Sequence, residues 1–93
     1  MSHEQSIHVI YSGSVQGVGF RFAAEDAARR TGVSGYVKNL PDGSVETVCE
    51  GTKDQLDDFL KYVETRMDGY IRNANVCWQP GTGRYNGFEI RFY

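Results

Sequence analysis

Hydrophobic and polar positions along this chain follow two periods, one typical of strands and one typical of helices. Runs rich in β-branched and aromatic residues, which favour strands, lie at residues 7–11, 33–39, 44–50, 71–78 and 88–92. Residues 21–30 are rich in Ala, Glu and Arg, whereas apolar side chains recur at helical spacing between Thr52 and Arg66. The pattern predicts the element order β-α-β-β-α-β, followed by a short C-terminal strand.

Both predicted helices carry recognisable signals at one end. Arg29 and Arg30 fall in the last turn of the first helix, and Gly32 stands where a C-terminal capping glycine is expected. Thr52 and Gln55 fit a capping box at the start of the second helix. These signals place the helix boundaries independently of the apolar pattern.

A turn between residues 39 and 44 predicts a hairpin in the middle of the chain. Leu40-Pro41-Asp42-Gly43 joins a residue with a preset φ, a side chain that bonds the local backbone, and a glycine. The flanking strands should therefore pair antiparallel. Together with the element order, this hairpin predicts an α+β ferredoxin-like two-layer sandwich, an antiparallel sheet with two helices on one face.

Composition and charge limit the classes of protein to which this chain can belong. The 93 residues suffice for a single domain, residues 1–93, with one core. Ten Lys and Arg against twelve Asp and Glu leave a net charge of −2, without the basic surplus of a general nucleic-acid binder. No apolar run is long enough to span a membrane, and residues 1–6 do not resemble a signal peptide. We therefore expect a soluble, cytoplasmic protein.

The two cysteines argue against a metal or disulfide framework. Cys49 and Cys77 are too far apart for a CxxC motif and too few for a disulfide scaffold. The carboxylates Asp54, Asp57 and Asp58 are best explained as a solvated helix face. We expect reduced thiols, no metal and no cofactor.

The glycine-rich stretch from Gly13 to Gly19 has features of an anion site. The residues just before the first helix are Val18, Gly19 and Phe20, and none of them has a side chain that caps a helix N-terminus. The unpaired N–H groups, the helix dipole and the Arg21 guanidinium would together suit phosphate oxygens. The stretch matches neither GxGxxG nor a P-loop, so a merely compact connection stays open at this point.

Two motifs resemble the signatures of the acylphosphatase family. Residues 15–21, Val-Gln-Gly-Val-Gly-Phe-Arg, are similar to V-Q-G-V-x-F-R. Residues 35–39, Gly-Tyr-Val-Lys-Asn, and residues 42–46, Asp-Gly-Ser-Val-Glu, are similar to the second signature. The similarity covers nearly the whole chain, with Ser14 where family members often carry Arg or Lys, and Tyr36 where Trp is more frequent.

The resemblance implies a hydrolase that splits acyl phosphates into a carboxylate and inorganic phosphate without metal or cofactor. Arg21 and Asn39 would be the catalytic residues, Arg21 holding the phosphate and Asn39 orienting the attacking water. Backbone N–H groups along the loop would complete the phosphate site, at Val15, Gln16, Gly17, Val18, Gly19 and Phe20. The implied partners are a small acyl phosphate and phosphate as a competitive inhibitor, with no nucleic acid and no membrane, and the implied state is a monomer.

A second reading is a regulatory domain of the same fold that binds an anion or RNA without turnover. An RNA-binding version should show exposed aromatic and basic residues on central strands, and this chain offers only Tyr36 with Lys38. Tyr36 could instead support the Asn39 site. His3 and His8 are expected to be structural or solvated, and Asp42 to serve its turn.

Overall fold

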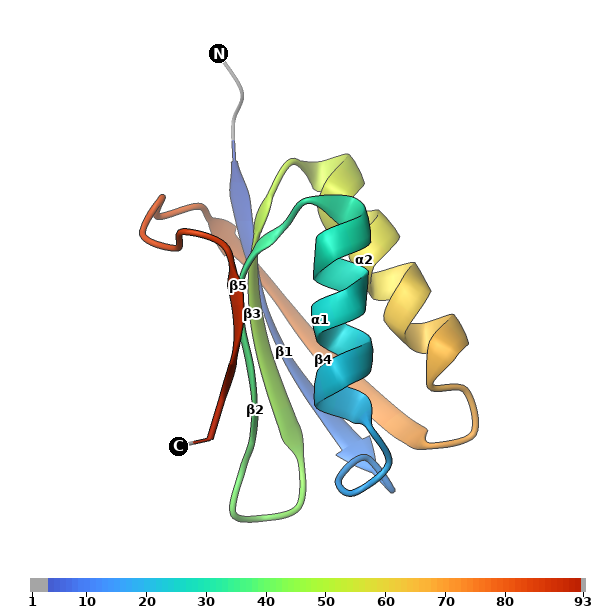
Figure 1. Ribbon diagram of the computed structural model, residues 1–93. Helices are drawn as coiled ribbons and strands as arrows, with labels where there is room; N and C mark the ends of the chain where they lie inside the picture. The colour runs from blue at the N-terminus through green and yellow to red at the C-terminus, as the bar shows by residue number, and fades with distance from the viewer. Residues whose placement is uncertain (1–3, 93) are drawn as a thin grey trace.

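A five-stranded sheet carries two helices on one face in the computed structural model, which describes residues 4–92 (Figure 1). The elements in chain order are β1 (Gln5–Gly13), α1 (Phe20–Thr31), β2 (Ser34–Asn39), β3 (Val45–Gly51), α2 (Lys53–Arg66), β4 (Ile71–Pro80) and β5 (Phe88–Arg91). The predicted ferredoxin-like two-layer sandwich is confirmed. Each predicted strand and helix is present, close to its expected boundaries.

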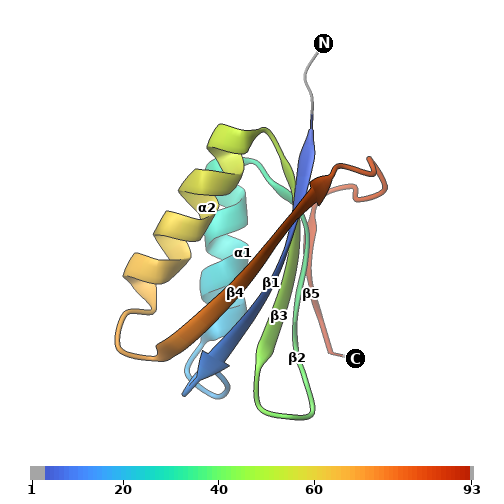
Figure 2. The same ribbon diagram turned by 180° about the vertical axis from the view of Figure 1, so that it is seen from behind.

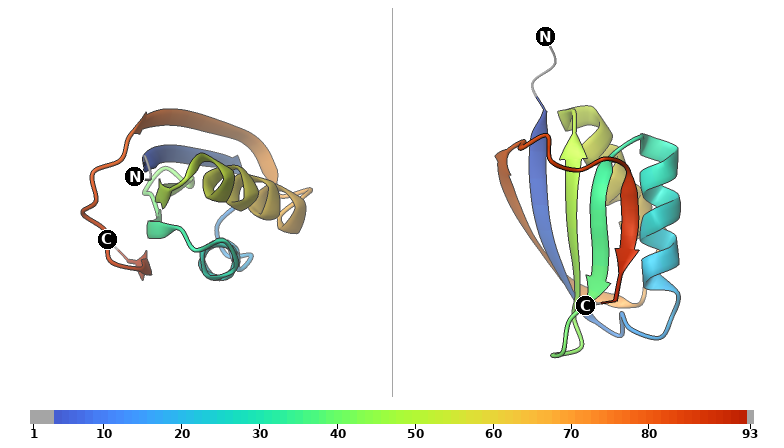
Figure 3. Two further views of the ribbon diagram at one scale, coloured as in Figure 1. Left: turned by 90° about the horizontal axis from the view of Figure 1, so that it is seen from above. Right: turned by 60° about the vertical axis from the view of Figure 1, so that its left-hand side comes forward.

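The strand order across the sheet is β4-β1-β3-β2-β5. Figure 2 shows β4 at one edge from behind, and the right-hand view of Figure 3 looks onto the face that the helices leave open. The sheet is mixed rather than wholly antiparallel, because β5 pairs with β2 in parallel. The chain leaves β4 at one edge, crosses the end of the sheet and descends beside β2 at the other edge (Figure 3).

The core lies between the sheet and the two helices. Alternation along β3 places Val45, Thr47 and Cys49 on the buried face. The other buried apolar side chains come mainly from β1 and the helices: Ile7, Val9, Tyr11, Phe20, Ala23, Ala24, Ala27, Ala28, Leu56, Phe59 and Val63. The four buried alanines have small side chains, so the backbone of α1 can pack close to the elements beside it.

The predicted helix ends are confirmed. Thr52 Oγ1 accepts from the Gln55 backbone N–H at 3.2 Å, and Gln55 Oε1 accepts from the Thr52 N–H at 2.9 Å, which completes the capping box. Gly32 closes α1 in the left-handed conformation, with φ 82°. In the hairpin turn, Asp42 Oδ1 accepts from the Ser44 N–H at 2.9 Å, and hydrogen bonds from Ser44 lower the pKa of Asp42. The structural role expected for Asp42 is therefore confirmed.

A buried carboxylate, which the sequence pattern does not single out, fixes the loop between β4 and β5. Glu50 is only 2% exposed. Its carboxylate accepts hydrogen bonds from the Thr82 hydroxyl at 2.7 Å, the Thr82 N–H at 3.0 Å and the Gly83 N–H at 2.9 Å. Burial raises the pKa of Glu50, but these hydrogen bonds outweigh it and the net shift is downward. Glu50 thus anchors the crossing that brings β5 to its parallel position.

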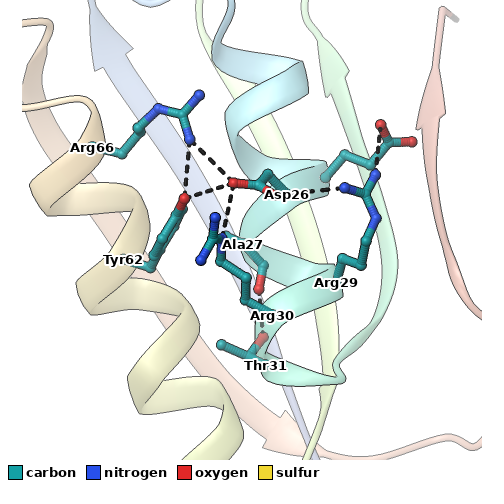
Figure 4. Close-up of polar contacts among 8 residues, drawn as sticks. Asp26, Ala27, Arg29, Arg30, Thr31, Tyr62 and Arg66 are labelled. Carbon is teal, nitrogen blue, oxygen red and sulfur yellow. Dashed lines mark hydrogen bonds and ion pairs between the residues drawn. The ribbon is translucent and has the colours of Figure 1, made fainter.

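A second polar cluster joins the outer surfaces of the two helices (Figure 4). Asp26 Oδ2 on α1 accepts from the Tyr62 hydroxyl at 2.6 Å, from Arg30 Nε at 3.1 Å and from Arg66 Nη1 at 3.2 Å. The Tyr62 and Arg30 hydrogen bonds, in that order, lower the pKa of Asp26 to about 2. Because Tyr62 and Arg66 belong to α2, Asp26 links the two helices.

Candidate active site

The loop between β1 and α1 meets the β2–β3 hairpin at one end of the sheet, the lower end in Figure 1. A cavity of about 190 Å³ opens there, lined by Val15, Gly17, Gly19, Phe20, Arg21, Phe22 and Asn39. β1 and β2 are not neighbours, since β3 lies between them. The fold nevertheless brings Arg21, which follows β1, and Asn39, which ends β2, to the same cavity.

The loop glycines serve two different purposes. Gly17 and Gly19 have φ of 77° and 81°, and a Cβ on either would meet no atom within 4 Å. Both positions therefore need glycine for backbone conformation, and both border open space. Gly13 differs, because a Cβ there would lie 2.5 Å from the backbone oxygen of Tyr70. Gly13 allows β1 to pack against the start of β4, while Gly17 and Gly19 shape the cavity.

The N-terminus of α1 points its free donors at this cavity. Gly19 precedes the helix without a side-chain cap, and the first helical hydrogen bond runs from the Ala23 N–H to the Gly19 carbonyl at 3.0 Å. The N–H groups of Phe20, Arg21 and Phe22 therefore have no acceptor within the helix. These three residues line the cavity, and residues 20–23 include no carboxylate. Unpaired donors and the helix dipole make this a favourable place for an anion.

Two of the residues predicted to bind phosphate do not line the cavity. Val18 packs against the hydrophobic core. The Gln16 side chain turns to the hairpin, where its Nε2 donates to the carbonyl oxygens of Leu40 at 2.8 Å and Ser44 at 2.9 Å. Gln16 therefore fastens the loop to the turn that directly follows Asn39.

Phe22 and Phe92 are site residues that the sequence analysis missed. Phe22 lines the cavity, and the guanidinium of Arg21 lies over the Phe92 ring, 5.0 Å from its centroid. This stacking covers one face of Arg21 and leaves its N–H groups in the guanidinium plane. One signal could have revealed Phe22: it is a large apolar residue outside the buried stripe of α1.

Tyr36 and His8 lie on the open face of the sheet and are bound to Glu46 rather than to the cavity. Glu46 accepts from the Tyr36 hydroxyl at 3.1 Å and contacts His8 Nε2 at 2.8 Å. Burial, followed by the neighbouring Glu46, raises the pKa of Tyr36 to about 12. His3 lies outside the described residues.

The remaining candidates take no part in the cavity. Lys53 pairs with Asp57 at 2.7 Å on the surface of α2. Cys49 is buried and Cys77 exposed, both as free thiols, and burial raises the pKa of Cys49. Among residues 4–92, no three His, Cys, Asp or Glu side chains group as metal ligands. Over the same residues, neither helix has the length and apolar character needed to cross a membrane.

Fold and cavity together define a small ferredoxin-like α+β protein with an anion-suited loop at the start of its first helix. A sequence model of the acylphosphatase family matches residues 7–90. The chain belongs to the acylphosphatase family of hydrolytic enzymes.

Individual relatives agree with this assignment. The acylphosphatase of Pelotomaculum thermopropionicum is 38% identical over 86 residues, which cover 91% of this chain and 94% of that one. The acylphosphatase of Bordetella bronchiseptica is 52% identical over 62 residues, a match that spans 67% of this chain and 66% of the relative. The crystal structure of acylphosphatase from Bacillus subtilis superposes with a TM-score of 0.88 at 29% identity, covering 95% of this chain and 99% of that chain.

Proposed function

We propose that this protein hydrolyses the carboxyl–phosphate anhydride of acyl phosphates, giving a carboxylate and inorganic phosphate. One observation carries the proposal: Arg21 and Asn39 line the same cavity at the uncapped start of α1. Membership of the acylphosphatase family supports the substrate class. A volume of about 190 Å³ is suited to a phosphoryl group and an attacking water, since a liquid water molecule occupies roughly 30 Å³.

In this proposal the phosphoryl group is held by Arg21 and by backbone N–H groups of the loop and of the first turn of α1. Phosphoryl transfer is promoted mainly by positioning and by stabilising charge on the three equatorial oxygens. The Arg21 guanidinium offers planar, charged donors to those oxygens. The Gln16 side chain is committed to the hairpin, so it takes no part in holding the phosphoryl group in this proposal.

Asn39 orients the water that attacks phosphorus opposite the leaving carboxylate. An amide does not act as a base near neutral pH, so Asn39 accepts a hydrogen bond without taking the proton. The water oxygen–phosphorus bond forms, the bond from phosphorus to the carboxylate oxygen breaks, and the proton of the water moves to a phosphate oxygen. The leaving carboxylic acid has a pKa of about 4, so the carboxylate departs without a general acid.

The proposed reaction uses no metal ion. The cavity lining contains no carboxylate, imidazole or thiol among its residues, and its cationic group is Arg21. We propose that this guanidinium and the helix N-terminus supply the charge stabilisation that a metal provides in other phosphoryl-transfer sites.

The direct test follows hydrolysis of benzoyl phosphate by the purified protein in the presence of EDTA. The expected result is turnover well above the uncatalysed rate, unchanged by EDTA, with competitive inhibition by inorganic phosphate. A phosphate monoester serves as the control substrate and should react poorly, because an alkoxide is a far worse leaving group. Phosphate binding without turnover would overturn the proposal and favour a binding domain, and loss of activity in EDTA would overturn the metal-free mechanism.

A further inference from the structure

A cavity that the proposed reaction does not use lies beside the start of β5, at the opposite end of the sheet from Arg21 (Figure 1). Its volume is about 360 Å³, within the range of about 300–1,000 Å³ that is typical of small-molecule sites. The side chains that line it comprise two cations, a carboxylate, an amide and two aromatic rings: Arg84, Arg91, Glu89, Asn86, Tyr85 and Phe88. This mixture of groups suits a ligand that is both charged and aromatic.

The loop between β4 and β5, residues 81–87, is held in place on both sides of the residues that line the cavity. On one side, the buried Glu50 carboxylate accepts hydrogen bonds from residues 82–83 at 2.7–3.1 Å. On the other side, the Gly87 carbonyl accepts from the Gly35 N–H at 2.9 Å. The side chains between these anchors are therefore presented on a fixed backbone, which reduces the entropic cost of binding a ligand.

Tyr85 supplies an aromatic surface in this cavity. Its ring is half-buried and lies against the Tyr36 ring, with 6.0 Å between the two centroids. The Arg91 guanidinium also stacks on Tyr36, 4.1 Å from the ring centroid. These contacts hold the Tyr85 ring at the cavity wall, where a flat ligand ring can stack on it.

Arg84 is a cation without a carboxylate partner among residues 4–92. Four of the seven arginines form ion pairs with carboxylates of the described chain, namely Arg29, Arg30, Arg66 and Arg91. Of the other three, Arg72 lies on β4, whereas Arg21 and Arg84 each line a cavity. A guanidinium in this position can bind a phosphate group through two parallel N–H donors.

Glu89 and Asn86 add polar groups that can select a ligand. Glu89 Oε1 accepts from Arg91 Nε at 3.2 Å and from Arg91 Nη2 at 3.1 Å. No donor of the described chain bonds to Glu89 Oε2, which can therefore accept from a ligand hydroxyl, as carboxylates do with ribose in dinucleotide-binding proteins. The Asn86 amide can both donate to and accept from the edge of a base.

We propose that this cavity binds a nucleoside monophosphate, with its base stacked on Tyr85, its phosphate at Arg84 and its ribose hydroxyls at Glu89. Arg91 keeps the Glu89 carboxylate in place and adds positive charge beside it. Two arginines against one glutamate leave an excess of positive charge in the cavity, although the chain as a whole has a net charge of −2. The site is separate from the Arg21 cavity, so this inference does not depend on the proposed hydrolysis.

The test titrates the protein with adenosine monophosphate (AMP) and follows its backbone amide signals by ¹H–¹⁵N NMR. AMP should bind with a sub-millimolar dissociation constant and shift the signals of residues 84–91. Adenosine, which lacks the phosphate, should bind about tenfold more weakly, and ribose 5-phosphate, which lacks the base, about fivefold more weakly. The shifts at residues 84–91 should persist in Arg21→Ala, which removes the phosphate-binding cation of the other cavity.

Variants of the two main contacts should separate their roles. Arg84→Ala should weaken AMP binding about tenfold and leave adenosine binding unchanged, because it removes only the phosphate contact. Tyr85→Ala should weaken the binding of both ligands about fivefold, whereas Tyr85→Phe, which keeps the ring, should bind both as the wild type does. Arg72→Ala is the matched control, since Arg72 is likewise exposed and without an ion pair in the described chain, and it should keep wild-type binding.

Several outcomes would overturn the proposal. If millimolar AMP leaves the signals of residues 84–91 unshifted, the cavity is not a nucleotide site. If ribose 5-phosphate or adenosine binds as tightly as AMP, the ligand is a simpler anion or an uncharged ring. Binding of a single-stranded RNA without binding of AMP would indicate a nucleic-acid surface instead. Hydrolysis of benzoyl phosphate is measured separately, so each of these results leaves the proposed function untouched.

Discussion

The side-chain amide of Gln16 donates a 2.8 Å hydrogen bond to the backbone carbonyl of Leu40, the residue that directly follows Asn39. The same amide donates to the Ser44 carbonyl at 2.9 Å, so it spans both ends of the hairpin turn. The loop preceding α1 is thereby held at a fixed distance from the residue proposed to orient water. Gln16 is a positioning residue in this view, acting through the backbone of the hairpin.

Replacing Gln16 with Ala should reduce catalysis more than its effect on folding explains. The change leaves two partly buried carbonyl oxygens without this donor, which should cost about 1–3 kcal/mol of unfolding free energy. Because Asn39 loses its fixed distance to the loop, kcat for benzoyl phosphate should fall at least tenfold with a smaller change in KM. Urea unfolding and steady-state kinetics measure the two effects.

Gln55→Ala is the matched control for that experiment. It removes the Gln55 side-chain half of the capping box of α2, far from the cavity, and should cost about 1 kcal/mol of stability while leaving kcat unchanged. If Gln16→Ala and Gln55→Ala have the same kinetic effect, the positioning role of Gln16 is wrong.

Arg21 and Asn39 should separate in their effects on binding and turnover. Asn39→Ala should lower kcat by about 10²–10³, or about 2.7–4 kcal/mol, while the inhibition constant for phosphate stays close to the wild-type value. Arg21→Ala should lower kcat/KM and also weaken phosphate inhibition, because it removes the cation that holds the phosphoryl group. An Asn39→Ala variant with near-normal kcat would refute the water-orienting role.

Local signals in the sequence predicted most of the fold. Three of these signals are the capping box at Thr52, the glycine after α1 and the turn at Asp42. Each involves residues only a few positions apart, so its structure depends little on the rest of the molecule. The parallel pairing of β5 with β2 was not predictable in this way. The crossing that leads to β5 is held by Glu50, which contacts a loop 32 residues further along the chain.

In the candidate site, too, features set by neighbouring residues were predictable and features set by distant contacts were not. Arg21 and the uncapped helix start follow from adjacent residues, whereas the meeting of Arg21 with Asn39 depends on the order of strands in the sheet. The sequence pattern places Phe92 within the last strand, but this residue lies beyond β5 and stacks on Arg21. Contacts between the chain end and α1 leave no local pattern that could reveal them.

Glu50→Gln should destabilise the protein and change the dependence of its stability on pH. The folded state lowers the pKa of Glu50, so its carboxylate stabilises the fold above its unfolded pKa of about 4.3, and this contribution is lost as pH falls below that value. The amide introduced by the substitution would place donors against the N–H groups of Thr82 and Gly83, at a cost of about 2 kcal/mol. Urea unfolding between pH 3 and pH 7 should show a smaller loss of stability on acidification for the variant. An unchanged pH profile would show that the anchored carboxylate does not contribute to stability.

Tyr62→Phe should raise the pKa of Asp26 from its value of about 2 toward the ordinary range. The Tyr62 hydroxyl is the largest cause of the lowered pKa, and Phe keeps the ring while removing that donor. Since the folded pKa lies below the unfolded one, the contribution of Asp26 to stability is present above about pH 4 and is lost as pH falls toward 2. The variant should lose this contribution at a higher pH than the wild type.

Carboxyl ¹³C chemical shifts followed through an acid titration measure the pKa of Asp26 directly. Asp42, whose pKa is lowered by hydrogen bonds from Ser44 in the hairpin turn, is the internal reference that Tyr62→Phe should leave unchanged. An Asp26 titration that is identical in both proteins would show that the arginines alone hold the carboxylate. Tyr62 would then have no part in the electrostatic link between the helices, and its hydroxyl would be only a neighbour of the Asp26–Arg66 pair.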